Sequence, residues 1–340
     1  HVAAPGGAGV YAFHEPTRPG NGDEKRAVHR AWRVGNRVGL GIPGRIAAVR
    51  VAVVADIHGN YHALDAVLAD LAQQGIDQII VNGDSVNRGP DSVKVLQRLR
   101  NVPHRQTLGN HDDLMLMALE PNGKNSWLSE PFWASVRYAA TELEAAGLLE
   151  PFRTLANHLE FTEHGSKFIV AHGSPRHYRE GLGQFLTPEV FSEILEEHPA
   201  DFLIGSHTHR PFVYEWGPHT VLNSGAVGMP FNGDPRAQYL ILEHRNGAWT
   251  WRFRRIPYDR DAAINHFLGT EYYREGGVST HIYVAEMRHA RSIFAPFTMW
   301  ATKYGHELDH ASWDQFQQQF ADRFIAAEMK QEIFETKEAG

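Results

Sequence analysis

The sequence predicts an α/β protein with two β-sheets flanked by helices. Apolar runs that suit buried strands alternate with helical periodicity between residues 49 and 112, an order typical of parallel strands joined by helices. Two hairpin patterns, at residues 159–172 and 237–256, then indicate antiparallel strands. Beyond Tyr258 the pattern becomes helical again. Together these observations predict two sheets with a helical extension at the C-terminal end.

The first half of the chain reads as β-α-β-α-β. Residues 49–55 form a nearly continuous apolar run, which is typical of a strand covered on both faces. The segment NYHALDAVLADLAQQG then predicts a helix, for which Asn60 is a suitable N-cap. The segments IDQIIVNGD, PDSVKVLQRLR and RQTLGNHD follow as strand, helix and strand. Right-handed connections between such strands make the sheet parallel in this region.

The second half is expected to be largely antiparallel after a helix near residues 131–146. In the second hairpin, Asn246 and Gly247 suit a type I′ turn. Past residue 258, Ser312 and Gln315 form a candidate capping box for a final helix. The apolar stripe on that helix is expected to pack on the body of the protein or on a second subunit; it contains Trp313, Phe316, Phe320 and Phe324.

Composition excludes several classes of function. The formal net charge of -7 leaves no basic excess for phosphate backbones or anionic lipids, so neither stable nucleic-acid binding nor membrane binding is expected. The absence of cysteine excludes disulfides, thiolate metal sites and cysteine nucleophiles. No apolar stretch approaches a membrane span, and we expect a cytoplasmic protein. Residues 1–46, rich in Gly, Arg, Pro and Ala, are expected to form a flexible N-terminal extension.

Metal-competent side chains follow five predicted strands. In LIGSHTHRP, two histidines one residue apart can project to the same side of an extended segment. Ligands of open α/β sheets gather at the carboxyl ends of strands. The residues at these ends are Asp56, His58, Asp84, Asn110, His111, Asp112, His172, His207 and His209. Carboxylate, imidazole and amide ligands without sulfur favour Mn, Fe or Zn over a soft metal.

Each of these residues also has a simpler interpretation when it is taken alone. Asp56 and Asp84 could be helix N-caps, which strand-to-helix loops often need. The four histidines outside the GNHD segment could be buried imidazoles bonded to the backbone, and Asn110 could occupy a turn. The agreement of ligand chemistry across five segments favours the metal site.

The order D-x-H, G-D, G-N-H-D, H-G and H-x-H, over residues 49–245, resembles the calcineurin-like metallophosphoesterase superfamily. The resemblance implies a four-layer αββα sandwich of two mixed sheets with two divalent metal ions at the strand ends, manganese first, with iron, zinc or nickel as alternatives. One ion would be held by Asp56, His58, Asp84 and His209. The other would be held by Asp84, Asn110, His172 and His207. Asp84 would bridge the two ions.

Two metal ions about 3.5–4 Å apart can activate a shared hydroxide as the nucleophile. His111, between Asn110 and Asp112, is then the candidate general acid for the leaving oxygen, and Asp112 is grouped with it as a candidate catalytic residue. Arg88 is placed to pair with phosphate oxygens, although a surface salt bridge is the alternative. Asn87 stands where similar protein phosphatases carry an aspartate that orients the catalytic histidine, and Leu114 stands in place of a second phosphate-binding arginine.

Asn87 and Leu114 both depart from the pattern of protein phosphatases and argue against that activity. The segments DIHGN, AHGSP and NSGAVGMPFNGDPRAQY resemble the bacterial phosphodiesterase branch, whereas Arg88 with Gly89 and Pro90 resembles the diadenosine tetraphosphatase branch. We therefore expect a metal-dependent phosphodiesterase acting on small esters or nucleotides. The alternatives are a phosphomonoesterase or dinucleoside polyphosphate hydrolase and, least favoured, a non-catalytic metal-binding scaffold. Residues 47–258 would form the catalytic domain and residues 259–340 a helical lid or a homo-oligomer contact.

Overall fold

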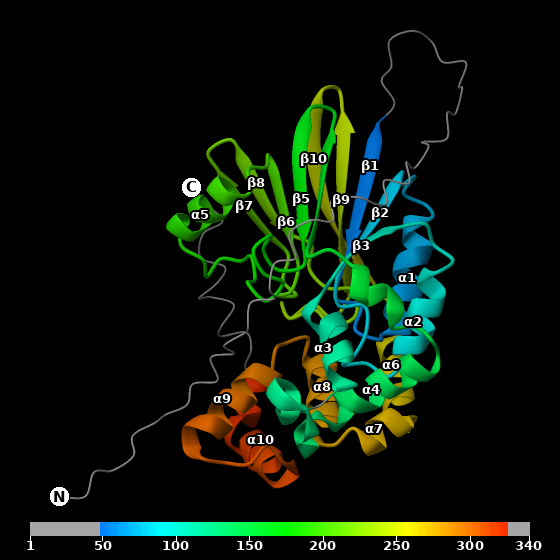
Figure 1. Ribbon diagram of the computed structural model, residues 1–340, viewed down its shortest axis with the longest axis vertical. Coiled ribbons are helices and arrows are strands. Elements are labelled where there is room, and N and C mark those ends of the chain that lie inside the picture. The colour runs from blue at the N-terminus through cyan, green and yellow to red at the C-terminus, as the bar shows by residue number, and fades with distance from the viewer. Residues whose placement is uncertain (1–47, 121, 326–340) are drawn as a thin grey trace, which may run out of the picture. The chain divides into compact units, whose positions relative to one another are not determined.

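Two five-stranded sheets organise the part of the chain that the computed structural model describes, residues 48–120 and 122–325 (Figure 1). The expected N-terminal extension lies outside the described residues. In spatial order, the first sheet consists of β10 (Ala248–Ile256), β9 (Ala237–Arg245), β1 (Val49–Val54), β2 (Gln78–Asn82) and β3 (Arg105–Thr107). The second consists of β4 (His158–Glu163), β5 (Ser166–Ala171), β6 (Phe202–Gly205), β8 (His219–Asn223) and β7 (Phe212–Trp216).

The helices of the first 200 residues are α1 (Tyr61–Leu71), α2 (Ser92–Leu99), α3 (Asn110–Ala118), α4 (Ala134–Ala145) and α5 (Pro188–Glu197). Short 3₁₀ helices occur at η1 (Gly123–Ser129), η2 (Pro131–Trp133) and η3 (Glu150–Thr154). The C-terminal helices are α6 (Arg260–Gly269), α7 (Glu271–Glu275), α8 (Val278–His289), α9 (Phe294–Tyr304) and α10 (His310–Ile325).

The pairing of the strands confirms the predicted change from parallel to antiparallel. β1, β2 and β3 are parallel neighbours, as the β-α-β-α-β order requires. β9 and β10 form the predicted antiparallel hairpin, and β4 and β5 form the other. At the turn between β9 and β10, Asn246 and Gly247 both have positive φ, 55° and 83°, in agreement with the type I′ prediction.

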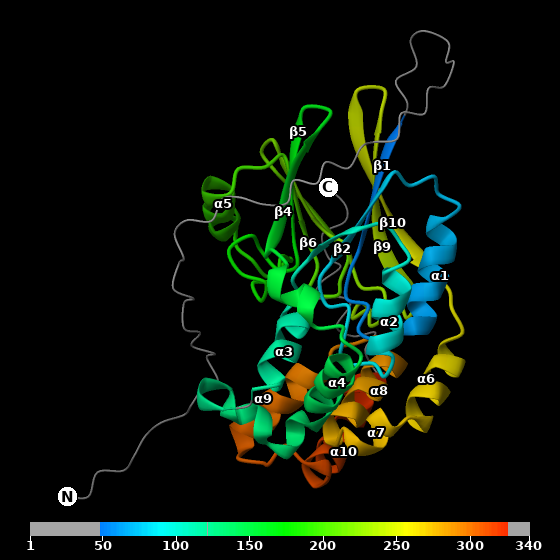
Figure 2. The same cartoon turned by 45° about the vertical axis from the view of Figure 1, so that its right-hand side comes forward.

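Alternation of side chains along the strands produces the layers. In β1, Val51 and Val53 pack between the two sheets, together with Phe168 of the second sheet. Ala52 and Val54 face the other way, into the core that the sheet shares with α1 and α2. The outer face of the second sheet packs against α5. Helix, sheet, sheet and helix therefore form four layers, and the predicted αββα sandwich is confirmed (Figure 2).

The aromatic residues of the C-terminal helices pack within the chain. Tyr272 and Tyr283 belong to the same hydrophobic core as Leu64 of α1. Trp313 and Phe316 of α10 are buried against α9. Of the predicted stripe, Phe320 is partly buried there, and the side chain of Phe324 lies outside the described residues. Within residues 48–120 and 122–325, no helix combines the length and apolar character that crossing a bilayer requires.

The predicted capping box of the final helix is wrong. The helix begins one turn earlier than Ser312 would require, at His310. The carboxylate of Asp309 accepts a hydrogen bond from the backbone N–H of Ser312 at 2.8 Å, so Asp309 has the capping role. Ser312 lies inside the helix and is buried.

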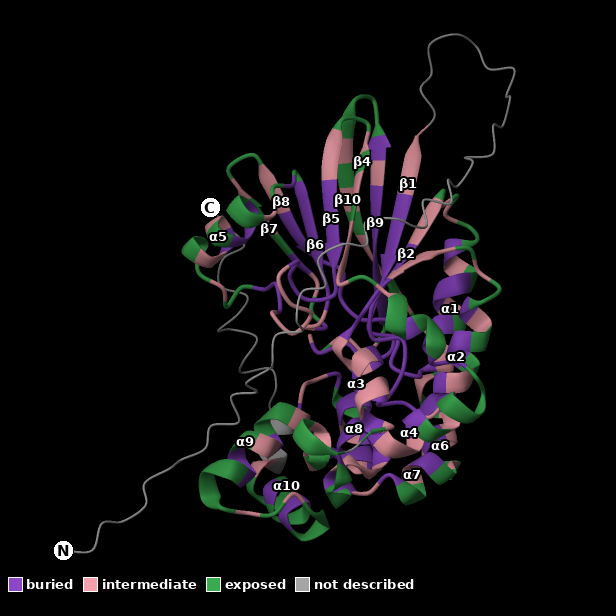
Figure 3. Cartoon of the chain, viewed as in Figure 1, coloured by how far each residue is buried: buried purple, intermediate pink, exposed green. Residues whose placement is uncertain are grey.

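The carboxyl ends of the parallel strands point toward α3, α4 and α8 (Figures 1 and 2). The loops that leave these strands are buried, in contrast to the exposed turns at the opposite end (Figure 3). Polar residues of five such loops are therefore enclosed between the sheets and the helices, which is where the sequence predicted a metal site.

Candidate metal site

The predicted ligands lie on loops with unusual backbone geometry. Five of them have φ between 48° and 58°, in the left-handed region that non-glycine residues rarely adopt: Asp56, His58, Asp84, His207 and His209. Each such residue costs about 1 to 3 kcal/mol and persists because the surroundings require it. The strained backbone of these loops therefore fixes the directions in which the side chains point.

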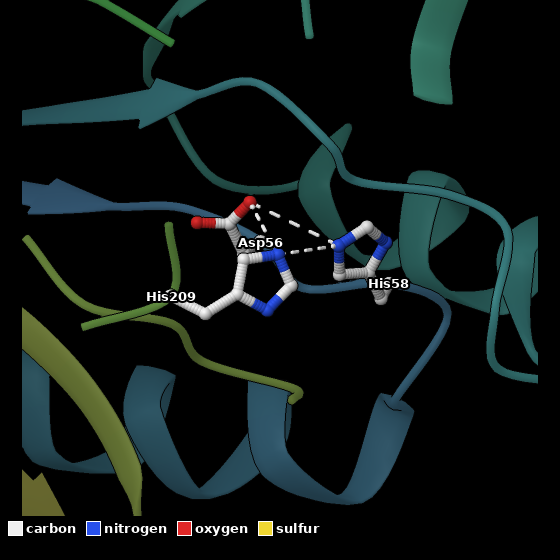
Figure 4. A group of neighbouring side chains, drawn as sticks. All are labelled: Asp56, His58 and His209. Atoms are coloured by element: carbon white, nitrogen blue, oxygen red, sulfur yellow. Dashed lines mark hydrogen bonds and ion pairs between the residues drawn. The ribbon is translucent and has the colours of Figure 1, made fainter. Parts of the chain in front are cut away.

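The first cluster contains Asp56, His58 and His209, whose ligand atoms lie within 4.8 Å of one another. The Nε2 atoms of the two histidines are 3.2 Å apart, and that of His209 is 3.3 Å from Asp56 Oδ1 (Figure 4). The three side chains come from the loops after β1 and β6, and all are buried. This arrangement brings together the first ion's predicted ligands.

The second cluster contains Asp84, His172 and His207, again within 4.8 Å. His172 Nε2 is 3.3 Å from Asp84 Oδ2 and 3.1 Å from the amide oxygen of Asn110. Asp84 Oδ2 also lies 3.7 Å from Nε2 of His58, in the first cluster. The two clusters therefore adjoin at Asp84, in the position predicted for a bridging ligand.

Hydrogen bonds fix the tautomers of three of these histidines. The Nδ1 atoms of His58, His172 and His209 face backbone carbonyl oxygens of Val86, Asn82 and Met229, at 3.3, 2.9 and 2.6 Å. A carbonyl only accepts, so each Nδ1 donates and each Nε2 points into the cluster, where it can bind a metal ion when it carries no proton. This is the arrangement by which metal-binding histidines are usually oriented.

Three carboxylate oxygens in the clusters lack a hydrogen-bond partner among the described residues. They are Oδ1 and Oδ2 of Asp56 and Oδ2 of Asp84, and all are buried. Buried anionic oxygens without donors are strongly unfavourable unless a cation compensates them. Oxygen and imidazole ligands suit a borderline divalent ion, so these residues fit the implied metal ions.

The alternative interpretations of the two aspartates are wrong. The N-cap of α1 is Asn60, whose side chain accepts from Ala63 N, and the N-cap of α2 is Asp91. The alternative for the histidines is correct for the Nδ1 atoms of His58, His172 and His209 alone, because Nε2 of each still faces the cluster. Neither Asp56 nor Asp84 is used to end a helix.

Protons and metal ions should compete for His172, so that metal binding depends on pH. Burial lowers the pKa of His172, but the Asp84 carboxylate outweighs this effect and raises the pKa to about 10. Below that pH the metal-free protein carries an extra proton there, which a metal must displace. Apparent affinity should therefore rise with pH, by up to about tenfold per unit. Titration calorimetry of Mn²⁺ in two buffers of different ionisation enthalpy should show about one proton released; no release, or equal release from His172→Asn, would contradict this.

Gly109 allows the loop before α3 to pass close to Asp84. A Cβ at position 109 would lie 2.2 Å from both N and Oδ1 of Asp84. We expect Gly109→Ala to displace Asp84, to lower stability by about 1 to 3 kcal/mol, and to weaken metal binding. Gly269→Ala is the control, because a Cβ there meets nothing within 4 Å. Urea unfolding and metal titration of both variants measure the two effects; equal behaviour would refute the role of Gly109.

His111 borders the first cluster, with its ring centroid 4.9 Å from that of His58. Its Nδ1 lies 2.9 Å from Nδ2 of Asn87. Burial, together with the charges of Arg88 and Arg179, outweighs the effect of Asp84 and lowers the pKa of His111 to about 3. The predicted pair of Asn87 and His111 is thus adjacent to the metal ligands.

Arg88 has a partner that the sequence did not indicate. Its Nη2 lies 3.1 Å from Oε2 of Glu286 on α8, and both side chains are buried. The guanidinium also stacks on Phe231, Tyr283 and Phe294, at 5.1 to 5.7 Å from the ring centroids. The salt bridge expected as the alternative for Arg88 is therefore present, but in the interior rather than on the surface.

Asp112 binds backbone rather than the clusters. Its two carboxylate oxygens accept from the N–H groups of Asp84, Ser85 and Gly109, at 2.9, 3.0 and 3.1 Å. It thereby joins the loop of Asp84 to the start of α3 and holds a candidate metal ligand in place. The sequence predicts a catalytic role for Asp112, but it does not indicate that Glu286, Tyr272 and Arg179 lie near Arg88, Asn87 and His111.

Comparisons with known proteins agree with this geometry. Residues 49–211 match the calcineurin-like phosphoesterase family. Phosphodiesterase YfcE of Escherichia coli K12 is 26% identical over 209 residues, covering 58% of this chain and 88% of YfcE. Serine/threonine-protein phosphatase 2 of the same strain is 36% identical over 122 residues, covering 35% of this chain and 56% of the phosphatase, so this chain spans about half of that relative.

A solved structure supports the fold. The crystal structure of a metallophosphoesterase from Sphaerobacter thermophilus is similar with a TM-score of 0.56 and 23% sequence identity, over 72% of this chain and all of that one. The range matched to the family contains every predicted metal ligand, from Asp56 to His209. The segment that carries the candidate metal ligands is therefore similar, over its whole length, to the calcineurin-like phosphoesterase family.

Proposed function

We propose that the chain hydrolyses small phosphodiesters or nucleotides with two divalent metal ions, manganese preferred, and with His111 serving the leaving oxygen. When bound, such ions lower the pKa of a coordinated water and polarise the phosphate. One ion would be held by Asp56, His58, Asp84 and His209, and the other by Asp84, Asn110, His172 and His207. Nε2 of His111 would donate to the leaving oxygen.

The observation that carries this proposal is the set of unpaired carboxylate oxygens. Both oxygens of Asp56 and one of Asp84 are buried without a hydrogen-bond partner among the described residues, beside three histidines whose Nδ1 atoms are bonded to backbone and whose Nε2 atoms point into the clusters. Buried anions without a compensating charge destabilise a fold, so this combination supports the binding of metal ions. The complete set of ligands also argues against a non-catalytic role.

The charge around the site favours a diester over a monoester. A monoester carries more negative charge and needs more cationic groups. Arg88 is already paired with buried Glu286, and Leu114, in the place of a second arginine, packs in the core. The similarity to Phosphodiesterase YfcE agrees with this preference. The similarity to a protein phosphatase covers a shorter segment, and Asn87 departs from the pattern of such enzymes.

A dinucleoside polyphosphate hydrolase is the second candidate. Arg179 lies close enough to His111 to help lower the pKa of that histidine, so positive charge is available beside the site. That charge could receive a further phosphate group of an extended substrate.

A cytoplasmic location and a homo-oligomer formed through the C-terminal helices stay predictions. Chromatography with light scattering would test the oligomeric state.

The test uses metal-stripped protein on bis-p-nitrophenyl phosphate and p-nitrophenyl phosphate. Mn²⁺, Ni²⁺, Zn²⁺ and Mg²⁺ are added back separately, and bound metal is measured in each case. We expect metal-dependent turnover that favours the diester and falls by about 10²-fold in His111→Ala, the usual effect of removing one donor. A strong monoester preference would contradict the phosphodiesterase. Absence of turnover with every metal, despite verified binding, would contradict the catalytic role.

A further inference from the structure

We infer that Asn87 fixes His111 as a donor of a single hydrogen bond and thereby restricts the site to weakly basic leaving groups, such as aryl oxides and the phosphate groups of phosphoanhydrides. This inference rests on the proposed function and deepens it, because it names the class of ester bond that the site breaks. Asn87 is a positioning residue here: it acts through His111 and not on the substrate.

The orientation of the Asn87 side chain is fixed by a backbone donor. Its Oδ1 lies 2.7 Å from the N–H of Arg88. A backbone N–H only donates, so the opposite assignment of the amide would place two donors against each other. The hydroxyl of buried Tyr272, on α7, donates to the same oxygen at 3.3 Å. The atom of Asn87 that faces His111 is therefore the amide nitrogen.

The amide nitrogen in turn fixes the tautomer of His111. It carries two hydrogens and accepts none, so His111 Nδ1, 2.9 Å away, must accept with its lone pair. The ring hydrogen then belongs to Nε2. Among the described residues none hydrogen-bonds to this Nε2–H, which leaves it for a substrate oxygen. A second ring hydrogen, on Nδ1, would be opposed by the amide group.

The consequence concerns the leaving oxygen. As the oxygen of water bonds to phosphorus, the bond between phosphorus and the leaving oxygen breaks and its electron pair goes to that oxygen. The water's proton leaves to solvent. The Nε2–H of His111 can hydrogen-bond the departing anion, but full transfer would leave an imidazolate ring. An aryl oxide or a phosphate tolerates departure as an anion, whereas an alkoxide needs the proton.

An aspartate at position 87 would reverse this arrangement. A carboxylate accepts from Nδ1–H, so His111 could hold hydrogens on both nitrogens and give one away. We expect Asn87→Asp to raise turnover of alkyl esters relative to aryl esters by at least about tenfold, within the range of effects of general acids. Asn101→Asp, at an exposed position on the end of α2, is the control for the added charge.

The experiment measures kcat/KM of the metal-loaded protein on diesters that share one group and differ in the basicity of the other, from p-nitrophenyl through phenyl to methyl. For the parent chain and for Asn101→Asp, kcat/KM should fall steeply as the leaving group becomes more basic. For Asn87→Asp the fall should be shallower. Equal slopes for all three would overturn the inference and leave the phosphodiesterase proposal intact. No metal-dependent turnover of any ester would overturn both.

A second measurement does not depend on activity. Nitrogen-15 spectra of the zinc-loaded chain, with His111 assigned by comparison with His111→Ala, report which ring nitrogen carries hydrogen. We expect hydrogen on Nε2 and a bare Nδ1. Hydrogen on Nδ1 would overturn the inference.

Discussion

Replacing Asp84 with asparagine should remove most metal-dependent activity, lowering kcat/KM by about 10³-fold, which corresponds to about 4 kcal/mol of lost transition-state stabilisation. Asp84 Oδ2 lies 3.3 Å from His172 Nε2 and 3.7 Å from His58 Nε2, so this one oxygen serves both clusters. It is buried without a hydrogen-bond donor among the described residues. A neutral amide would weaken the attraction for both ions at once.

The loop itself should survive this substitution. Asp84 Oδ1 accepts from the backbone N–H of His111 at 2.7 Å, and an asparagine oxygen can accept in the same way. Asp65→Asn, on the exposed side of α1, controls for the change in charge. Metal content by elemental analysis and kcat/KM on bis-p-nitrophenyl phosphate decide the outcome. Two bound ions and unchanged activity in Asp84→Asn would show that Asp84 is not the shared ligand.

The meeting of the candidate metal ligands could be predicted from the sequence because topology brings these residues together. Parallel strands end at one edge of a sheet, so residues after several strands must meet there whatever the details of packing. Asp56, Asp84 and His172 each follow such a strand, and the structure brings them within reach of one another. The positive φ values of Asp56 and Asp84 were not predictable from residue type, since most aspartates lie outside the left-handed region.

Contacts made by the C-terminal helices could not be predicted in this way. Glu286 lies in a helix whose sequence, VSTHIYVAEMRH, gives no sign that a carboxylate is buried. A glutamate on a helix is usually solvated, and only the packing of α8 against the loop after β2 gives it Arg88 as a partner. Tyr272 is similar: its aromatic ring predicts burial, but not a hydrogen bond to Asn87.

The error at the last helix has a local cause. Asp309 and Ser312 are both good N-cap residues, and they are three positions apart. The sequence pattern alone does not choose between them. In the structure Ser312 is buried and its backbone N–H is bonded to Asp309, so packing of the helix against α9 selects the earlier start.

Replacing Glu286 with alanine should lower the free energy of unfolding by about 3 to 5 kcal/mol, because it leaves the buried Arg88 charge without its partner. The substitution should also destabilise the start of α9. Glu286 Oε1 accepts from the N–H groups of Ile293 and Phe294, at 2.8 and 2.9 Å, where that helix begins. Glu286→Gln keeps an oxygen for these two donors and should therefore destabilise less than the alanine variant.

Urea unfolding of the metal-free chain measures these differences. Glu144→Ala, at an exposed position of α4, should stay within about 0.5 kcal/mol of the parent. Arg88→Met combined with Glu286→Leu should recover much of the loss, because apolar replacement of a buried pair is often neutral or stabilising. The three aromatic rings around Arg88 offer the methionine an apolar environment. If Glu286→Ala unfolds like Glu144→Ala, the buried pair does not stabilise the junction between α8 and the Arg88 loop.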